Sequence, residues 1–243
     1  MASIRKVLIF VAMEEEAAPL IASLGLVKSA TGIVGAPTVL HEGLCGAAHV
    51  SVVCPGRDAA SGVNLVGTQF ATLTVFLAAK QLLPDLIINA GTSGGFKRAG
   101  GSVGDIYSVT AFQYHDRRIP IPGYTEYGIC ANETHPTPLL VAALGLKSGI
   151  CSTGDSLDCV PSDADAMTAS NAACKDMEGA AVASIAKLVG VPFVAIKVIT
   201  DIVDGEHATQ DEFLRNLATA SAALQGVVPK VVAFVAGKTL ANL

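Results

Sequence analysis

The sequence predicts an α/β protein in which residues 1–243 form one domain, with helices on both faces of a central sheet. Short apolar runs rich in Val and Ile, such as 6–12 and 191–200, alternate with longer segments that are apolar in helical patterns. No linker, repeat or low-complexity segment interrupts this alternation. A chain of 243 residues that is 51% hydrophobic can bury one sizeable core. These observations favour a helix–sheet–helix arrangement in layers.

The first elements follow from apolar runs and their flanking residues. Residues 6–12 are a continuous β-rich apolar run and are predicted to be a buried strand. An acidic first turn then opens a helix over 13–24. The Gly-, Thr- and Val-rich segment 31–44 predicts a short hairpin, and 50–54 predicts another buried strand.

A glycine-rich stretch follows the next strand. A long apolar helix is predicted over 62–83, and the strand 86–89 runs directly into the glycine-rich stretch 91–95. Open α/β sheets bind ligands at such places, although the stretch is equally explained as a tight turn that uses Gly for positive φ. It matches neither the dinucleotide nor the nucleoside-triphosphate motif. A strand over 103–112 and an irregular binding or interface loop over 114–127 come next.

The second half of the chain continues the alternation. A helix is predicted over 138–146, a strand over 149–152 and a loop over 153–158. The polar segment 160–172 is expected to contain a short helix. After the helix that begins at Glu178, residues 191–200 predict a central buried strand, and the last helix is expected over 211–235.

Composition argues against several functional classes. The net charge is −5 without a basic stripe, so nucleic acid is not an expected partner. The N-terminal apolar run is too short for a signal peptide, and no apolar run reaches the ~18 residues of a membrane span. Six cysteines without a CxxC pair and five scattered histidines predict neither a metal site nor disulfides, and favour a cytoplasmic location. With only 15% charged residues, we expect an oligomer.

Four acidic residues attract attention as candidates for a site. Asp176 and Glu178 bracket Met177 before a small, apolar helix, where Glu178 could simply be a helix-start residue favoured by the macrodipole. Glu16 follows the first strand and Asp201 ends the 191–200 strand. The carboxyl ends of strands line one crevice in such sheets, so Glu16, Glu178 and Asp201 are predicted to surround one pocket.

Carboxylates placed across a pocket suit the hydrolysis of a glycosidic bond. A protonated carboxyl assists the leaving group, and an ionised carboxylate activates water. The simpler alternative makes Asp201 a helix cap or a salt-bridge partner, for example of Lys197, a charge inside an apolar strand.

The order of the motifs resembles the 5′-methylthioadenosine/S-adenosylhomocysteine nucleosidases of the purine nucleoside phosphorylase superfamily. The resemblance spans residues 6–235 and, in three segments (53–58, 116–122 and 154–158), is similar to the plant-type branch in particular. The motifs that carry it are Ala12-Met-Glu-Glu-Glu16, Pro84-Asp-Leu-Ile-Ile-Asn-Ala-Gly-Thr-Ser-Gly-Gly95, Val103-Gly-Asp-Ile106, Tyr114-His-Asp116, Ser152-Thr-Gly-Asp155, Asp176-Met-Glu178 and Ile199-Thr-Asp201.

The resemblance implies a fold and an activity. The fold is a three-layer αβα arrangement with a central twisted mixed sheet. The activity is hydrolysis of methylthioadenosine to adenine and 5-methylthioribose in methionine salvage, without a metal or cofactor and with weak activity on S-adenosylhomocysteine at most. The implied unit is a homodimer in which Ile119, with Tyr124 or Tyr127, reaches into the neighbouring subunit's pocket.

The resemblance also implies roles for residues within one subunit. Glu16 deprotonates the attacking water, Asp201 donates a proton toward N7 of adenine, and Glu178 accepts hydrogen bonds from the ribose hydroxyls. The other substrate-binding residues implied are Met13, Thr92, Leu157, Asp158, Lys175, Asp176, Met177 and Lys197. Met177 packs on the sugar, Thr92 lies where the glycine-rich stretch approaches the ligand, and Leu157 and Asp158 flank the base.

The sequence departs from the bacterial pattern at three of these positions. Lys197 stands where bacterial members carry Arg, and it keeps the charge without the fork geometry. Asp176 stands where many have Glu, and Asp158 replaces an apolar residue beside the base.

Two other functions are compatible with the same fold. A phosphorylase of the superfamily needs cationic partners for phosphate, and here the strand before the glycine-rich stretch carries Asn89 rather than an arginine, so Arg57 is the only nearby candidate. A non-catalytic nucleoside-binding protein is the other alternative, against which the retention of all three acids argues.

Overall fold

A computed structural model describes residues 3–243. Within that range the strands form one ten-stranded mixed sheet in the order β10-β6-β8-β9-β5-β1-β4-β3-β2, with β7 paired to β6. The strands are β1 (Lys6–Phe10), β2 (Val27–Lys28), β3 (Val39–Cys45), β4 (Ala48–Cys54), β5 (Leu86–Gly95), β6 (Ile106–Tyr114), β7 (Asn132–Glu133), β8 (Lys147–Thr153), β9 (Ala172–Asp176) and β10 (Phe193–Ile202).

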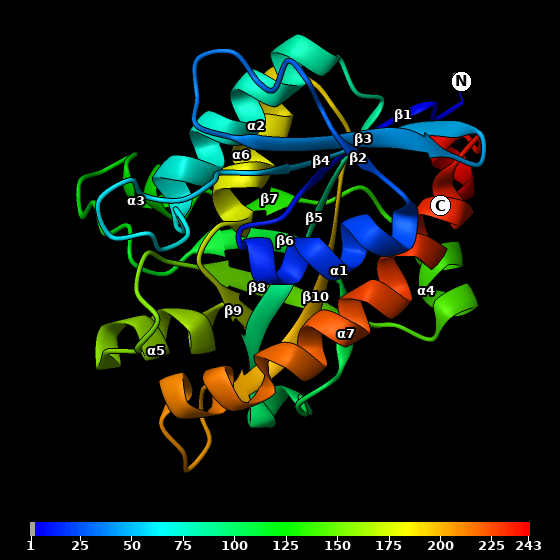
Figure 1. The fold of residues 1–243 in the computed structure, drawn as a ribbon. Helices are drawn as coiled ribbons and strands as arrows, with labels where there is room; N and C mark the ends of the chain where they lie inside the picture. The colour runs from blue at the N-terminus through cyan, green and yellow to red at the C-terminus, as the bar shows by residue number, and fades with distance from the viewer. Residues whose placement is uncertain (1–2) are drawn as a thin grey trace.

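Helices cover both faces of this sheet, as the sequence predicts. Helices α2 and α6 pack together on one face, and α1 and α7 pack together on the other (Figure 1). Each face has its own buried apolar cluster. The α-helices are α1 (Glu14–Leu24), α2 (Thr68–Leu82), α3 (Thr125–Ile129), α4 (Pro138–Leu144), α5 (Pro161–Ala169), α6 (Gly179–Val189) and α7 (Thr209–Val235). Two 3₁₀ helices, Lys97–Ala99 and Leu240–Asn242, complete the described chain.

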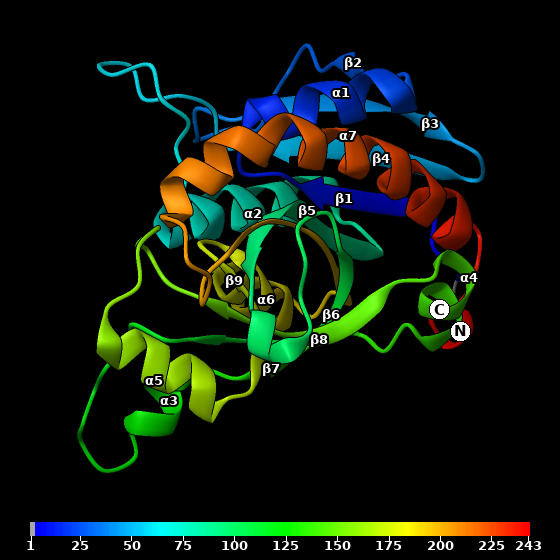
Figure 2. The ribbon, with the colours of Figure 1, turned by 90° about the horizontal axis from the view of Figure 1, so that it is seen from below.

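Strand β5 is the centre of the sheet. It pairs in parallel with β1 and β10, and its last residues, Gly94 and Gly95, pair antiparallel with β9. Because β10 also pairs with β6, and β6 connects through β8 to β9, these five strands close on one another beneath α7 (Figure 2). The closed end of the sheet brings the ends of β5, β9 and β10 together.

The predicted glycine-rich turn is wrong, because β5 continues through it to Gly95. Neither Gly91 nor Gly94 nor Gly95 has a positive φ. Their small size is needed instead for close approach. A Cβ on Gly94 would lie 2.8 Å from Asp201 Oδ2, and one on Gly95 would lie 2.8 Å from Ile199 Cγ2. These glycines therefore admit side chains of β10 against the strand.

Other boundaries differ from the sequence predictions as well. The hairpin predicted over 31–44 is instead formed by β3 and β4, and 31–38 contain no strand. Helix α2 begins at Thr68 rather than near residue 62, because residues 55–67 form an irregular segment. Strand β9 was not predicted, since five residues ending in Lys175 and Asp176 lack a clear apolar run.

Helix α7 is long and apolar enough to cross a membrane by length and composition alone, and among residues 3–243 it is the one helix with this property. As the sequence indicated, α7 contains no uninterrupted apolar run of ~18 residues, because polar residues such as Asn216, Gln225 and Lys230 interrupt it. In the structure α7 packs against β5, β10 and α1, and buries residues such as Val228, Val231 and Val235 in the core. A core helix of this kind passes the same test.

Candidate active site

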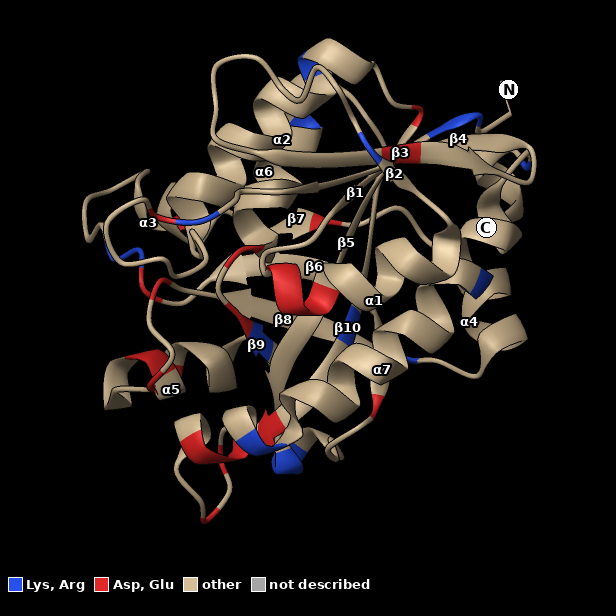
Figure 3. Cartoon of the chain, viewed as in Figure 1, with Lys and Arg blue, Asp and Glu red and all other residues tan. Residues whose placement is uncertain are grey.

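A cavity of about 280 Å³ lies where β5, β9 and β10 meet the first turns of α1 and α7. Figure 3 shows that charged residues of α1, β9 and β10 lie near one another in the middle of the fold. Asp158, Ile119, Tyr124 and Tyr127 do not line the cavity of their own chain, whereas the other predicted site residues do. These are Met13, Glu16, Thr92, Leu157, Lys175, Asp176, Met177, Glu178, Lys197 and Asp201.

Asp201 presents one free carboxylate oxygen to this cavity. The side chain is only 2% exposed and lies in β10 at a register shift in the pairing with β5. Its Oδ1 accepts a hydrogen bond from the Thr200 hydroxyl at 2.7 Å, whereas the buried Oδ2 has no partner in the described chain. Burial raises the pKa of Asp201, against the opposing effects of the Thr200 hydroxyl and the Lys175 charge. The residue is suited to hold a proton and donate it to a ligand.

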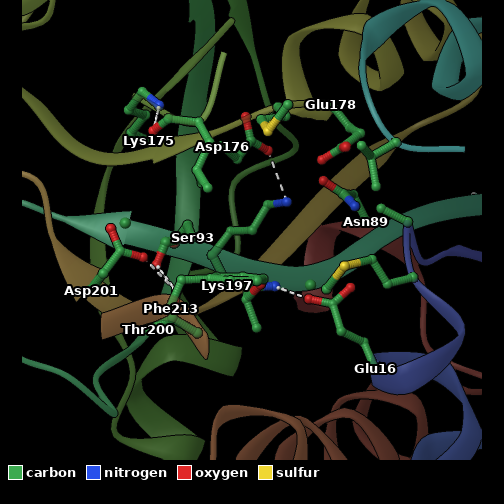
Figure 4. Close-up of a pocket in the computed structure, with 18 of the residues that line it drawn as sticks. Glu16, Asn89, Ser93, Lys175, Asp176, Glu178, Lys197, Thr200, Asp201 and Phe213 are labelled. Carbon is green, nitrogen blue, oxygen red and sulfur yellow. Dashed lines mark hydrogen bonds and ion pairs between the residues drawn. The ribbon is translucent and has the colours of Figure 1, made fainter. Parts of the chain in front are cut away.

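Glu16 lies away from Asp201 in the same cavity (Figure 4). It is 2% exposed in the first turn of α1, and its Oε1 accepts a hydrogen bond from the Thr92 amide at 2.8 Å. Burial raises the pKa of Glu16, while the Thr92 hydrogen bonds and the charge of Lys197 favour the ionised form. Thr92 thus contributes its backbone amide to Glu16 from within β5, and not from a turn.

Glu178 is a further buried carboxylate of the cavity. It precedes α6, and its Oε1 accepts a hydrogen bond from the Gly67 amide at 2.8 Å. Burial, followed by the charge of Asp176, raises the pKa of Glu178 to about 7. Glu178 does stand at the start of α6, as the simpler alternative predicted, but within residues 3–243 its side chain makes no capping bond. It lines the cavity instead, and Asp176 Oδ2 accepts the hydrogen bond from the Gly179 amide.

Asp176 and Lys197 form a buried ion pair at the floor of the cavity. Lys197 Nζ lies 2.8 Å from Asp176 Oδ2. The other oxygen of Asp176 accepts a hydrogen bond from the Thr153 hydroxyl. Burial opposes the charge of Lys197, but Asp176 outweighs it and keeps the pKa of Lys197 above its ordinary 10.5. The alternative in which Lys197 pairs with Asp201 is therefore wrong.

Lys175 holds the loop that carries Leu157. Its Nζ donates hydrogen bonds to the carbonyl oxygens of Ser156 at 2.7 Å and Leu157 at 2.8 Å. Burial lowers the pKa of Lys175. Leu157 reaches the cavity from this loop, whereas the neighbouring Asp158 is exposed and does not line it.

The remaining predicted residues lie outside this subunit's cavity. Ile119 is half-buried, and Tyr124 and Tyr127 are 54% and 62% exposed. The two tyrosine rings meet edge to face, with the Arg117 guanidinium over the ring of Tyr127. None of the three lines the cavity of its own chain.

Several cavity residues escaped the sequence reasoning. Asn89 and Ser93 of β5 each have a buried side-chain oxygen without a partner in the described chain. Both line the cavity, together with Thr200 of β10. Asn89 could have been identified because it is a polar residue in an otherwise apolar strand. Buried polar groups normally have hydrogen-bond partners, so such a residue suggests a site.

The structure also locates Arg57, the arginine considered as a phosphate ligand. Its guanidinium pairs with Glu14 at 2.8 Å and with Glu15 at 2.6 Å, outside the cavity. Lys175 and Lys197 are the cationic side chains of the lining within the described chain, and both have partners. Among residues 3–243, no three His, Cys, Asp or Glu side chains form a group that could hold a metal ion.

The fold and this cavity define an α/β protein with a small-molecule site in which four buried carboxylates, one of them paired with a lysine, line the cavity together with apolar side chains. Residues 6–233 match the family model of the phosphorylase superfamily, and the chain belongs to that superfamily. The predicted family and the predicted αβα fold with a mixed central sheet are thereby confirmed.

The chain is similar along almost its whole length to two proteins of Arabidopsis thaliana. It is 46% identical to a 5′-methylthioadenosine nucleosidase over 99% of this chain and 91% of that protein. It is 45% identical to a 5′-methylthioadenosine/S-adenosylhomocysteine nucleosidase over 99% of this chain and 95% of that one. The solved structure of Arabidopsis thaliana 5′-methylthioadenosine nucleosidase in apo form superposes with a TM-score of 0.97, at 45% identity, covering 99% of this chain and all of the other.

Proposed function

We propose that this protein hydrolyses the N-glycosidic bond of 5′-methylthioadenosine, releasing adenine and 5-methylthioribose. The observation that carries the proposal is the buried Asp201 carboxyl, whose Oδ2 has no partner among residues 3–243, in one cavity with Glu16 and Glu178. The similarity to nucleosidases that act on this substrate supports it. The product of this reaction belongs to methionine salvage.

Asp201 acts in this mechanism as the general acid. Adenine leaves poorly as an anion, so a proton delivered to its ring makes departure feasible. A carboxyl whose pKa is raised by burial retains that proton closer to neutral pH than an exposed aspartate. The Thr200 hydroxyl fixes Oδ1 and leaves Oδ2 for the base.

Glu16 and Glu178 act on the sugar side. As the bond to adenine breaks, the ribosyl centre becomes cation-like, and nearby carboxylates stabilise that charge more strongly in the transition state than in the substrate. Glu16, ionised with help from the Thr92 amide and Lys197, takes the proton of the attacking water. Glu178 accepts hydrogen bonds from the ribose hydroxyls, and Met177 packs against the sugar.

The charged groups around this cavity favour water over phosphate as the attacking nucleophile. A phosphate dianion in a dry pocket needs cationic partners. Arg57 is engaged by Glu14 and Glu15, and Asn89 of β5 offers the cavity only a neutral amide. Glu16 would in addition repel the anion from the position of the water.

The active unit in this proposal is a cytoplasmic homodimer. The apolar composition supports association, as do exposed apolar side chains on the described surface, among them Ile121, Tyr124 and Tyr127 of the loop predicted to cross the interface. The six cysteines are unpaired in the described chain, which suits a reducing compartment. Sedimentation that finds an active monomer at micromolar concentration would contradict the dimer.

One assay tests the activity and separates the alternatives. The protein is incubated with methylthioadenosine with and without phosphate, and free adenine and the sugar product are measured. We expect adenine and 5-methylthioribose at a rate that phosphate does not raise. A phosphate-dependent rate with a sugar 1-phosphate product would establish a phosphorylase, and binding without product would establish a nucleoside-binding protein.

A further inference from the structure

The Glu178 carboxylate is held in the cavity by a single backbone amide. Within residues 3–243 its one hydrogen-bond donor is the amide of Gly67, at 2.8 Å from Oε1. Gly67 comes from a part of the sequence 111 residues away. The orientation of Glu178 toward a ligand therefore depends on how the segment before α2 is fixed.

Gly67 is in a conformation that only glycine adopts readily. Its φ is 97° and its ψ is 172°, and it follows the irregular segment 55–66. The residue also has no room for a side chain, because a Cβ would lie 2.8 Å from Asp155 Oδ1. Such a backbone keeps its place only when surrounding contacts over-determine it.

Asp155 supplies those contacts. Its Oδ1 accepts a hydrogen bond from the Thr68 amide and its Oδ2 accepts one from the Thr68 hydroxyl, both at 2.6 Å. Both carboxylate oxygens are thus used on the residue next to Gly67. The peptide that joins Gly67 to Thr68 is thus held by an acid that itself does not line the cavity.

Asp155 is in turn fixed by the strand ends around it. Its amide donates to Asp116 Oδ2 at 2.8 Å, and the preceding Gly154 amide donates to the Asp176 carbonyl oxygen at 3.2 Å. The clamp therefore connects the end of β6, the end of β8 and the end of β9 to the start of α2.

We propose that Asp155 is a positioning residue that holds the Gly67 amide on Glu178 and so orients this carboxylate toward the sugar hydroxyls of the substrate. The proposal rests on the proposed nucleosidase function, in which Glu178 binds those hydroxyls. A purely structural role, as a cap of α2, is the competing explanation, because an acid at a helix N-terminus stabilises the helix by itself.

Substrate analogues distinguish the two roles. Asp155→Ala is compared with the unsubstituted protein on methylthioadenosine and on its 2′-deoxy and 3′-deoxy analogues. We expect kcat/KM for methylthioadenosine to fall about 10- to 100-fold, the range of a lost hydrogen bond to a charged group. On the analogues, which lack a hydroxyl for Glu178, the same substitution should change kcat/KM by less than about 3-fold.

Three further variants keep the test decisive. Asp155→Asn retains an acceptor for the Thr68 amide and should recover most of the activity. If Asp155→Ala does not fold, Thr68→Val, which removes the hydroxyl contact to Asp155 Oδ2, takes its place in the same comparison of substrates. Asp165→Ala, an exposed acid on α5, is the matched control and should leave all three values unchanged. Equal losses on all substrates, or an Asn variant as poor as the Ala variant with unchanged folding, would overturn the proposal. An unsubstituted protein without activity on methylthioadenosine would instead overturn the proposed function, and the inference with it.

Discussion

Lys197 Nζ lies 2.8 Å from Asp176 Oδ2, and the two side chains are 2% and 1% exposed. Asp176 also accepts hydrogen bonds from the Thr153 hydroxyl and the Gly179 amide, so both of its oxygens are satisfied. This pair connects β10, which carries Asp201, to β9, which leads to Glu178. It therefore fixes the relative position of two of the three acids.

Removing one member of this pair should destabilise the fold strongly. Lys197→Met leaves the Asp176 carboxylate buried without its partner, and the expected loss is about 3–5 kcal/mol in the free energy of unfolding. Urea denaturation measures it. The control is Lys147→Met, whose 2.6 Å pair with Asp105 is partly exposed and should matter by at most about 1 kcal/mol. Similar losses for both variants would show that burial of the Lys197–Asp176 pair does not increase its contribution to the free energy of unfolding.

Stability should fall as the pH rises through the titration of Glu178. The pKa of this group is about 7 in the folded protein, above its ordinary value of 4.5, because burial disfavours the charged form. The folded state thus binds more protons than the unfolded state between these values. The stability that this group contributes is complete below pH about 4.5 and is lost as pH rises to about 7.

Glu178→Gln removes this titration and should flatten the decline. The variant should have a higher Tm than the unsubstituted protein at pH 8, and the difference should shrink toward pH 5. Glu133→Gln, an exposed position in β7, is the control. If the Tm difference between Glu178→Gln and the unsubstituted protein were the same at every pH, the raised pKa would be refuted.

Gly94→Ala should damage catalysis more than folding. The added Cβ would lie 2.8 Å from Asp201 Oδ2 and 2.6 Å from Val203 Cγ2, so the Asp201 carboxyl must move. A displacement of about 1 Å at a catalytic group can lower the rate by about 100-fold, and we expect at least a 10-fold fall in kcat. Gly226→Ala is the control, since a Cβ there meets nothing within 4 Å in the described chain, and helical Ala is favoured over Gly. A Gly94→Ala protein with normal kcat would show that catalysis does not depend on the close approach of Gly94 to Asp201.

Methylthioadenosine should be preferred over S-adenosylhomocysteine. The homocysteine tail adds an ammonium and a carboxylate, and a buried unpaired charge is unfavourable by several kcal/mol. Both lysines of the described lining already have partners, and the apolar side chains of Val66, Leu157 and Phe213 suit a methylthio group. A discrimination of ~100-fold in kcat/KM needs only about 2.7 kcal/mol. A ratio near one for the two nucleosides would mean that the tail leaves through an open channel.

Much of the fold follows from local patterns in the sequence. The apolar runs of β1 and β10 and the acidic starts of α1 and α7 mark these elements to within a few residues. The clustering of Glu16, Glu178 and Asp201 follows from a general property of α/β sheets, because the carboxyl ends of neighbouring strands share one edge.

The remaining features depend on contacts between distant segments. The residues of 91–95 resemble a turn locally, yet they form a strand whose glycines admit Asp201 and Ile199. The sequence offers Lys197 several acidic residues as possible partners. It pairs with Asp176 because β9, which carries Asp176, lies beside β5 in the sheet. The role of Asp155 could not be predicted from the sequence either, because its partner Thr68 is 87 residues away.

The most direct test of the account is a comparison of two leaving groups in the Asp201→Asn variant. One substrate is methylthioadenosine, whose adenine needs a proton to depart. The other is the 4-nitrophenyl glycoside of 5-methylthioribose, whose leaving group departs as a stable anion. If Asp201 is the general acid, kcat for methylthioadenosine should fall by at least ~100-fold, while the nitrophenyl substrate should change by less than about 3-fold. Glu16→Gln, which removes the base, should slow both substrates. Equal losses on both substrates in Asp201→Asn, or a near-normal rate on methylthioadenosine, would contradict the assignment of Asp201 as the proton donor.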